Sequence, residues 1–442
     1  MLNKNDIKEL LNVNNIFIDD VKTFIDNKNP TNNQIIIDVH LHKSIDNLCP
    51  HCGKKCEVYD LGQGIRKWRS LDFGDIKVFI RSIANRVCCP EHGAVVKKFP
   101  WARHDSWFTY DFEQTVAWLA VNSSKTVISQ FMRISWNTVG PIISRIKNDL
   151  DINPASRYEN LKIIGVDETS YKKQRKYLTL IVDHEEKCVI WVHIKHGKSI
   201  FEEFFKELNE SQRDSIEIVS GDGAKWIDEC MNEYTPLAIR VVDPFHAVKW
   251  VSDALDELRK QRWRELYEKE KNKPKRKRGR PKKDETKNKE TTAKDIKGTK
   301  PLLLYGNDKL TDSQRAKLDI ALAMDSKLNK AYTYKEAFRA IFKMTDVVDA
   351  AIELDKWLSW ARRSQIKEFV ELYYKIKKHR SHILAAIEYK ISNARLEAIN
   401  NKVKLTIRMA YGFRNIENLI DLIMLRCSNI VVQLPYELRK AS

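Results

Sequence analysis

The sequence of 442 residues contains no long hydrophobic run, and its cysteines are few. No apolar stretch approaches the roughly 18 to 20 residues that a membrane-spanning helix needs. The segment Met1–Asp20 also lacks the basic stretch followed by an apolar one that marks a secretion signal. We therefore expect a soluble protein that stays in the cytoplasm.

Eight cysteines are too sparse for a disulfide scaffold in a chain of this length. Five of them lie between Cys49 and Cys89, and this crowding predicts metal binding rather than cross-links. Acidic residues are also too few to balance the basic ones, because 60 Asp and Glu stand against 78 Lys and Arg, a net charge of +18. The excess predicts a polyanionic partner, with nucleic acid as the first interpretation and a membrane surface as the second.

The length predicts two to four domains. We expect residues 1–45 to form an N-terminal arm with a helix around Ile7–Val13. Alternating apolar and polar residues between turn-forming glycines predict short strands in residues 46–105. From 106 to 152 the apolar residues recur at helical spacing and predict a small helical module.

Beyond Pro154 the pattern predicts three strands followed by alternating helices and strands, the βββαβαβ order of a ribonuclease-H-like core. We assign this core to residues 158–258 and 385–430. Residues 259–384 are predicted to be a long α-helical insertion, in which the polar, charge-dense stretch 269–300 should be disordered. The predicted fold class is multidomain α/β. The expected strands are Leu161–Val166, Tyr177–Val182, Cys188–Ile194, Ile216–Val219 and Leu237–Val242, and the helices are Phe201–Leu208 and Ala224–Tyr234.

Two short motifs of one kind predict a zinc site. Cys49-Pro-His-Cys52-Gly and Cys89-Pro-Glu-His92-Gly each place two ligands three residues apart with a glycine after the second. Three thiolates and one imidazole can close a tetrahedral zinc site and stabilise a strand-rich unit that has little core. Chance or redox chemistry is the alternative reading, and Cys88 could replace Cys89 as a ligand.

A helix-turn-helix is predicted in the helical module. Residues 123–132 form the first helix, 133–135 the turn with Ser135 as N-cap, and 136–146 the second helix. The second helix of such a motif enters the major groove of DNA, although any helical hairpin gives similar periodicity. The candidate contacts are Trp136, Asn137, Thr138 and Arg145, with Arg145 expected to face outward.

Three acidic residues stand at positions where their side chains could meet. Asp167 ends the first expected core strand, Asp222 follows the fourth, and Glu397 lies in a helix over Asn393–Ile407. The first and fourth strands of a ribonuclease-H-like sheet are neighbours, so both aspartates should share one sheet end. Taken singly, such an Asp is usually a turn residue and such a Glu is usually solvated.

A basic run lies in the expected disordered loop. Lys275-Arg276-Lys277-Arg278-Gly279-Arg280-Pro281-Lys282-Lys283 resembles an AT-hook, in which Arg278 and Arg280 would insert into a narrow A/T minor groove. A plain charge run is the alternative.

The whole pattern resembles the ISL-three family of insertion-sequence transposases, whose members carry a zinc finger, a helix-turn-helix and a DDE catalytic domain in that order. The resemblance spans most of the chain. It departs from the family where His92 replaces a commoner cysteine and where the insertion carries an unusually basic loop. The residues that carry it are Cys49-Pro-His-Cys52-Gly, Gly165-Val166-Asp167-Glu168, Asp222, Val242-Asp243-Pro244-Phe245-His246, Asp256 with Arg259, Leu396 to Lys404, and Arg408 to Asn415.

The resemblance implies that Asp167, Asp222 and Glu397 are the catalytic trio of a DNA transposase. Oxygen ligands suit Mg²⁺, and two such ions, for which Mn²⁺ can substitute, would support cleavage and rejoining of DNA strands. Asp243 and His246 would orient substrate or water, with a local structural role as the alternative. Lys402, Lys404 and Arg408 would contact phosphates or form a solvated basic face.

The expected partners are the transposon ends and the target, both double-stranded DNA. Pairing of two ends predicts a homodimer on DNA, and the expected location is the bacterial cytoplasm in association with the nucleoid. A DNA-binding regulator derived from a transposase but without catalysis is the main alternative. A structure-selective nuclease or resolvase on the same core is the second.

Overall fold

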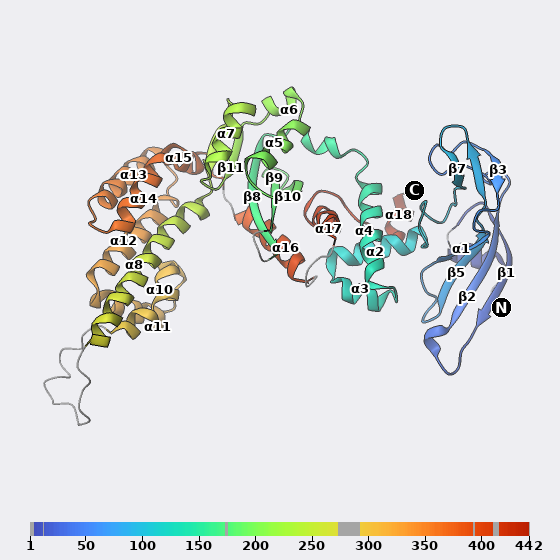
Figure 1. Ribbon diagram of the computed structural model, residues 1–442, viewed down its shortest axis with the longest axis horizontal. Coiled ribbons are helices and arrows are strands. Elements are labelled where there is room, and N and C mark those ends of the chain that lie inside the picture. Colours follow the sequence, from blue (N-terminus) through green and yellow to red (C-terminus); the bar gives the residue numbers. More distant parts are fainter. Residues whose placement is uncertain are drawn as a thin grey trace. The chain divides into compact units, whose positions relative to one another are not determined.

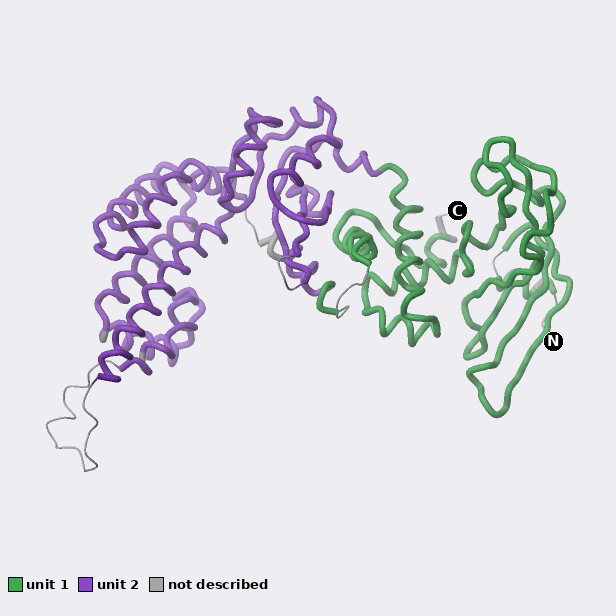
Figure 2. The backbone as a smooth tube through the Cα atoms, in the orientation of Figure 1, with its two compact units in different colours: residues 1–153, 406–442 green, residues 154–405 purple. Residues whose placement is uncertain are grey.

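The computed structural model describes residues 4–11, 13–172, 176–272, 292–391, 394–409 and 415–441 (Figure 1). The chain divides into two compact units, residues 1–153 with 406–442, and residues 154–405 (Figure 2). No helix among the described residues combines the length and the apolar character needed to cross a membrane.

The first unit begins with helix α1 (Lys4–Leu11) and a four-stranded sheet of order β1-β2-β5-β4. Its strands are β1 (Ile16–Phe24), β2 (Gln34–Leu41), β5 (Lys77–Ile83) and β4 (Ile65–Arg69). Strand β2 pairs in parallel with β5, so that Ile37 lies opposite Ile80, and both side chains are fully buried. Residues 1–45 are therefore not a separate arm as the sequence suggested, because their β-branched run completes the sheet of the following region.

A smaller sheet carries the two cysteine motifs at its ends. Its strands β3 (Glu57–Asp60), β6 (Arg86–Cys89) and β7 (Gly93–Val96) are antiparallel in the order β3-β6-β7. The hairpin of β4 and β5 lies between the two motifs in sequence and belongs to the larger sheet. This explains the long separation of the motifs.

The helical module contains α2 (Tyr110–Asn122), α3 (Lys125–Phe131) and α4 (Trp136–Leu150). Hydroxyls of Thr109, Ser124 and Ser135 accept hydrogen bonds from the first turns of the three helices. Two C-terminal helices, α17 (Glu417–Cys427) and α18 (Pro435–Ala441), complete the module.

Helix α17 closes the core of the helical module. Leu422 and Leu425 pack in one cluster with residues of α2 and α4. The buried guanidinium of Arg426 donates to the Ala120 and Ser123 carbonyls at the end of α2. The sequence assigned residues 385–430 to the catalytic core, but those from Thr406 onward belong to the first unit because α17 buries its apolar face there.

The second unit is built on a five-stranded sheet of order β10-β9-β8-β11-β12. Strands β8 (Ile163–Lys172), β9 (Lys176–Asp183) and β10 (Cys188–Ile194) form antiparallel pairs, and β11 (Ile218–Gly221) runs parallel to β8 and to β12 (Ile239–Val242). The predicted βββαβαβ order and the adjacency of the first and fourth strands are both present. Helices α5 (Lys198–Glu207), α6 (Glu210–Asp214) and α7 (Lys225–Tyr234) connect the strands.

Both faces of this sheet are covered. Phe201, Phe204 and Phe205 of α5 are fully buried and pack in one core with Ile164 and Val219 of the sheet. A separate cluster brings residues of α15 (Arg380–Glu388) against β11 and β12. The β-branched strands are therefore buried on both sides, which their near-continuous apolar runs indicated.

The insertion is helical, as predicted, but the stretch 269–300 that the sequence assigned to a disordered loop is helical at both ends, since a helix continues through 272 and residues 293–297 form another. The insertion begins within α8 (Pro244–Asn272), the long helix that directly follows β12, and its core contains Leu255, Phe338, Trp357 and Phe369. Helix α16 (Ala394–Met409) follows α15 and carries residues that line a pocket beside the five-stranded sheet. The AT-hook-like residues Arg278 and Arg280 lie outside the described residues. The other helices of the insertion are α9 (Ala293–Lys297), α10 (Lys300–Leu304), α11 (Asp312–Met324), α12 (Ser326–Ile341), α13 (Val347–Arg362) and α14 (Lys367–Lys378).

Candidate active site and metal centre

Asp167 lies on the central strand of the five-stranded sheet. The sequence placed it at the end of its strand, but β8 continues to Lys172 because it stays paired with β9 on its other edge. The parallel pairing with β11 stops at Gly165 and Ser220, two residues before Asp167. Asp167 therefore stands where the second neighbouring strand has ended, which opens space above the sheet.

Asp222 directly follows β11, so the register of the parallel pair, continued by two residues, sets it beside Asp167. Its Oδ1 accepts a hydrogen bond from the Ala224 amide (2.9 Å) at the start of α7. The backbone on both sides of Asp222 is tightly packed. A Cβ on Gly221 would lie 2.9 Å from Val166 Cγ1, and one on Gly223 would lie 2.4 Å from Trp250 Cζ2.

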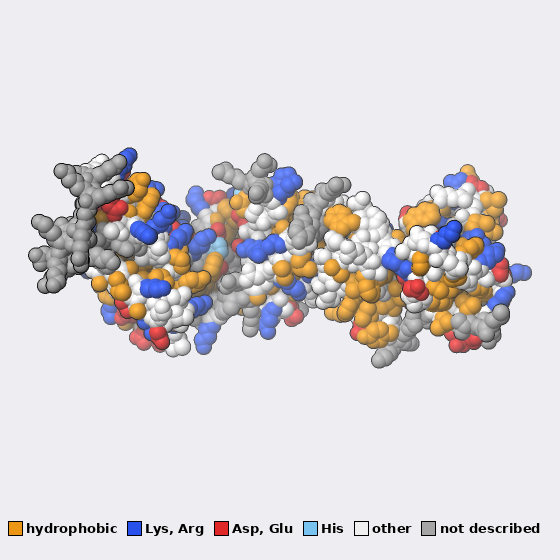
Figure 3. Space-filling view, turned by 90° about the horizontal axis from the view of Figure 1, so that it is seen from below, with side chains coloured by type: hydrophobic (Ala, Val, Ile, Leu, Met, Phe, Trp, Pro, Cys, Tyr) orange, Lys and Arg blue, Asp and Glu red, His pale blue; other side chains and the backbone are white. Residues whose placement is uncertain are grey.

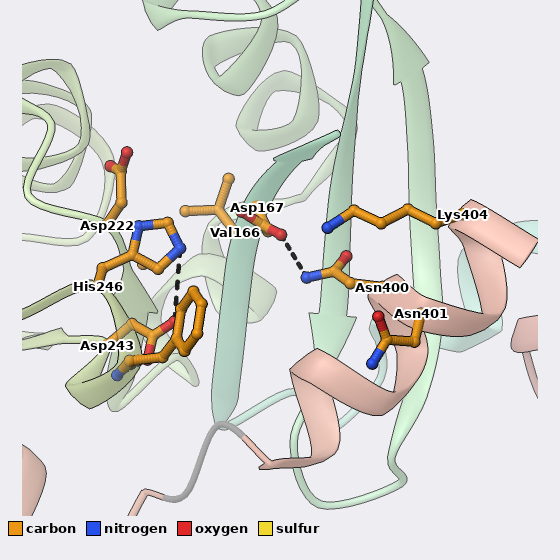
Figure 4. Close-up of a pocket in the computed structure, with 10 residues that line it drawn as sticks. Val166, Asp167, Asp222, Asp243, His246, Asn400, Asn401 and Lys404 are labelled. Carbon is orange, nitrogen blue, oxygen red and sulfur yellow. Dashed lines mark hydrogen bonds and ion pairs between the residues drawn. The ribbon is translucent and has the colours of Figure 1, made fainter. Parts of the chain in front are cut away.

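One pocket of about 110 Å³ brings both aspartates together with residues from two other segments, 243–246 and 400–404 (Figure 4). Asp243 follows β12, and its Oδ2 lies 3.7 Å from His246 Nε2. Its Oδ1 accepts from the Phe245 amide (2.7 Å), which fixes the start of α8. The lining residues are Val166, Asp167, Gly221, Asp222, Asp243, Phe245, His246, Asn400, Asn401 and Lys404.

Helix α16 closes the pocket from the side of β8. Asn400 donates a hydrogen bond from Nδ2 to Asp167 Oδ2, and Lys404, one turn further on, also lines the pocket. Asn400 was part of the family-like string but had no predicted role. The backbone of Glu397 lies in the first turn of α16, whereas its side chain lies outside the described residues.

Burial dominates the electrostatics of Asp167. It raises the pKa of the carboxyl above its ordinary value, while His246, the Asn400 amide and Lys404 favour the charged form and oppose the rise. Burial likewise raises the pKa of Glu168, whose carboxylate accepts from the Gly197 amide (3.0 Å) at the start of α5. The charged form of Asp167 therefore has few compensating partners within the protein, and a bound cation would supply one.

The acidic edge does not form a closed ligand cluster in the described residues. The only group of three or more close metal-binding side chains found among them is the cysteine and histidine cluster of the first unit. Figure 4 shows the Asp222 carboxylate turned away from Asp167. Its hydrogen bond to Ala224 explains this orientation, since two unscreened carboxylates also repel each other.

A cation that interacts with Asp222 was not predicted from the sequence. Lys375 Nζ of α14 lies 4.0 Å from the centre of the Trp250 ring, and this ring covers Gly223. Burial lowers the pKa of Lys375, and the charges of Asp222 and Asp253 oppose the lowering. Nothing in the local sequence connects α14 with the loop after β11, so only the folded insertion shows this neighbour.

The predicted zinc ligands do converge. One ligand atom each from Cys49, Cys52, Cys89 and His92 lie within 4.8 Å of one another. Cys52 Sγ lies 3.6 Å from Cys89 Sγ, and His92 Nδ1 lies 3.5 Å from Cys89 Sγ. These separations match the edges of a tetrahedron with zinc–ligand bonds of roughly 2.0 to 2.3 Å. Cys88 is exposed and outside the cluster, so Cys89 is the member of the pair whose thiol faces the other three groups.

The backbone conformation of the two motifs explains why each contains a glycine. Gly53 and Gly93 adopt φ values of 71° and 67°, in the left-handed region that other residues rarely enter. Hydrogen bonding to His92 lowers the pKa of the Cys89 thiol to about 6, which favours the thiolate that zinc binds. The four ligand atoms therefore have the spacing and the chemistry that a structural zinc ion requires.

Three family models match the chain in the order of its parts. Residues 47–92 match the zinc-finger of transposase IS204/IS1001/IS1096/IS1165, and residues 98–146 match the helix-turn-helix domain of transposase family ISL3. Residues 164–423 match the DDE transposase domain of ISL3, which covers more than half of the chain. The chain belongs to the ISL3 family of transposases.

Curated relatives agree with this assignment. The ISL3 transposase is 40% identical over 393 residues to the transposase for insertion sequence element IS1557 of Mycobacterium tuberculosis strain H37Rv, which covers 89% of this chain and 88% of the relative. It is 23% identical over 374 residues to the transposase for insertion sequence element IS1001 of Bordetella parapertussis, covering 84% of this chain and 86% of that protein.

The helix-turn-helix of this transposase has the predicted turn and N-cap, but α3 covers 125–131 rather than 123–132, and α4 continues to Leu150 rather than ending at 146. Helix α3 ends at Phe131, Arg133 turns the chain at φ 54°, and Ser135 caps α4 by accepting from the Asn137 amide. Asn137 is exposed, while Trp136 and Thr138 are half-buried.

Arg145 does not face outward as the sequence suggested. Its guanidinium donates to the carboxylate of Glu113, a fully buried residue of α2. A charge buried at this position requires a partner, and Arg145 supplies it together with Arg103.

The predicted phosphate contacts of α16 are exposed but do not share one face. Lys404 and Arg408 are four residues apart and lie on the same side of the helix, while Lys402 is about 200° away from Lys404. Only Lys404 lines the pocket.

Proposed function

We propose that this transposase binds the terminal inverted repeats of an insertion sequence and cleaves and joins DNA strands with Mg²⁺ bound by Asp167, Asp222 and Glu397. The observation that carries the proposal is the placement of Asp167 and Asp222 on neighbouring strands in one pocket, with the helix of Glu397 beside them. The strand order 3-2-1-4-5, with the first three strands antiparallel, supports a ribonuclease-H-like core.

The residues of the pocket fit divalent cations of the Mg²⁺ type. Carboxylate and amide oxygens line it, and these are the ligands that such cations prefer. When bound, two such cations generate a nucleophile from water and stabilise the leaving oxygen of a phosphodiester. In this proposal Asp167, Asp222 and Glu397 would hold the cations, and Mn²⁺ would substitute for Mg²⁺.

The other side chains of the pocket position these groups and the DNA. Asn400 donates to Oδ2 of Asp167 and so restrains the orientation of this carboxylate. Lys404 places a positive charge where a phosphate would enter, and Asp243 holds His246 at the opposite wall. Hydrolysis at the element's end frees a 3'-hydroxyl, which then attacks a phosphodiester of the target in the same pocket.

Binding of the ends is assigned to the first unit. The start of α4, with exposed Asn137 between the half-buried Trp136 and Thr138, is the part that would enter a major groove. Lys and Arg side chains are spread over the surface seen in Figure 3, in keeping with the net charge of +18. Two bound ends require two transposase chains, so we propose a homodimer on DNA. Arg278 and Arg280 would add minor-groove contacts.

The test uses DNA that carries the element's inverted repeats. Asp167→Asn, Asp222→Asn and Glu397→Gln each keep the size of the side chain and remove its charge. Each should lower Mg²⁺-dependent strand cleavage by about 10³-fold or more while DNA binding persists. The matched control is Glu217→Gln, because Glu217 precedes β11 at the far end of the same strand and its side chain is 64% exposed.

Undiminished cleavage by any of the three variants would overturn the carboxylate assignment. A protein that binds the repeats but never cleaves them, with or without the substitutions, is the non-catalytic regulator. Cleavage that depends on DNA structure but ignores the repeat sequence identifies a nuclease or resolvase instead.

A further inference from the structure

The helical insertion contains a basic groove that the pocket chemistry does not use. It measures about 570 Å³ and lies where the C-terminal ends of α13 and α14 meet the start of α15. Four of its lining residues are cations and one is a carboxylate. The lining residues are Asp355, Leu358, Ser359, Arg362, Arg363, Tyr373, Lys377 and Arg380.

The cations of this groove are held in place mostly by neutral groups. Arg362 Cζ and Lys377 Nζ each lie 5.8 Å from the ring centre of Tyr373, which is only 8% exposed. The guanidinium of Arg363 donates to the carbonyl and hydroxyl of Ser359. These contacts fix the side chains without cancelling their charge, so that less conformational entropy would be lost when an anion binds.

Acidic side chains pair with only part of the positive charge in the groove. Arg380 donates twice to Asp355, at 2.8 Å each, and this is the groove's one ion pair. Arg362, Arg363 and Lys377 have no acidic partner among the described residues, and Arg362 and Lys377 are exposed. Cations near the C-terminal ends of helices could be explained by a favourable interaction with the helix dipole. That interaction does not explain why several ordered cations face one groove.

We propose that this groove binds the phosphate backbone of duplex DNA and makes the insertion a second DNA-contacting surface of the transposase. The proposal rests on the proposed function for the identity of the polyanion. The groove is lined by charged, hydrogen-bonding and aromatic groups, and none of its lining residues is an Asn or Gln whose amide could read a base. We therefore expect it to contact phosphates without sequence specificity.

The groove belongs to the same compact unit as the acidic pocket. Helix α15 begins at the groove with Arg380 and packs through Ala385 and Ala386 on β11 and β12, the strands that precede Asp222 and Asp243. One rigid helix thus connects the two sites. DNA held in the groove would therefore be held by the element that supports the pocket.

The test measures binding of the full chain to a labelled duplex as a function of salt, without divalent metal. The double variant Arg362→Ala/Lys377→Ala should reduce the slope of log affinity against log salt by about 2, roughly 0.9 per phosphate contact. It should weaken binding to the terminal-repeat duplex and to an unrelated duplex of the same length by the same factor.

The matched control removes two charges from the same helices outside the groove. In Lys356→Ala/Lys367→Ala each lost lysine has a glutamate partner on its own helix, Glu353 or Glu371, and the slope should not change. The charge-keeping variant Arg362→Lys/Lys377→Arg should retain the wild-type slope, which separates loss of charge from loss of fold. An unchanged slope in the alanine double variant, or an equal fall in the control, overturns the proposal. Because no cleavage is measured, failure of the carboxylate assignment leaves this result unaffected.

Discussion

The transposase has two candidate metal centres, and they differ in how far the protein completes them. The four zinc ligands come from two short motifs, and their ligand atoms already lie within 4.8 Å of one another. The acidic residues come from distant parts of the chain, and Asp222 is turned toward the Ala224 amide. Two local motifs can therefore bring four metal-binding groups together on their own, whereas under the proposed function the acidic edge would need bound cations and DNA to screen its charges.

The first way to break this comparison is to measure bound metal. The full chain after dialysis without DNA should retain about one zinc per chain and little Mn²⁺, because apparent zinc binding in such sites amounts to about 10 to 16 kcal/mol. Cys89→Ser should lose the zinc by elemental analysis and lower the thermal midpoint. Cys88→Ser is the control, because Cys88 is exposed outside the cluster. Equal zinc loss in both variants would contradict the assigned ligand set.

A second measurement tests the histidine of α15 and the one directly before this helix, which pack near the loop that carries Asp222. The quantity measured is the free energy of unfolding as a function of pH. Burial lowers the pKa of His379 to about 4, and its Nδ1 lies 3.3 Å from Nδ1 of His382, whose pKa burial also lowers. The unfolded state therefore takes up protons first as the pH falls. Above about pH 6.5 the neutral His379 does not reduce the free energy of unfolding. Between pH 6.5 and 4 the unfolded state binds a proton that the folded state does not, so the free energy of unfolding falls progressively, by about 3 kcal/mol at most.

The matched variant for this pH dependence is His379→Gln. It removes the titrating ring, so the free energy of unfolding should fall less steeply between pH 6.5 and 4 than in the wild type. Chemical denaturation at several pH values gives the comparison, and carboxylates that titrate in the same range cancel in the difference. Parallel pH profiles would show that His379 is not the group responsible.

The third change acts on the loop that carries Asp222. In Gly223→Ala the new methyl group would meet Trp250 at 2.4 to 2.6 Å, so the loop or the indole must move. We expect a loss of about 2 kcal/mol in stability and a lower cleavage rate with zinc content unchanged. Gly298→Ala is the control, since the nearest atom to its Cβ would be 4.0 Å away. Full cleavage by the Gly223 variant would show that the loop tolerates displacement.

The sequence predicted the parts of the fold that are determined by interactions between residues close together in the chain. The cysteine motifs and the capped turn at Ser135 are local, and the β-branched runs of β8 to β12 are buried on both faces, so their signals were strong. Strands β1 and β2 were missed because their place in the sheet depends on β5, far along the chain. Asn400, Lys375 and the Glu113 partner of Arg145 were missed for the same reason, since each contact joins distant segments.

Helix α17 gives the helical module an unusual dependence on the end of the chain. Its Leu422 and Leu425 fill the core beneath α4, so this core closes only after the ribosome has made the catalytic sheet and the insertion. A product of premature termination would leave that apolar core open and would be a poor competitor for the repeats under the proposed function. Under the proposed function, recognition of a transposon end would therefore require a chain that also contains the acidic pocket.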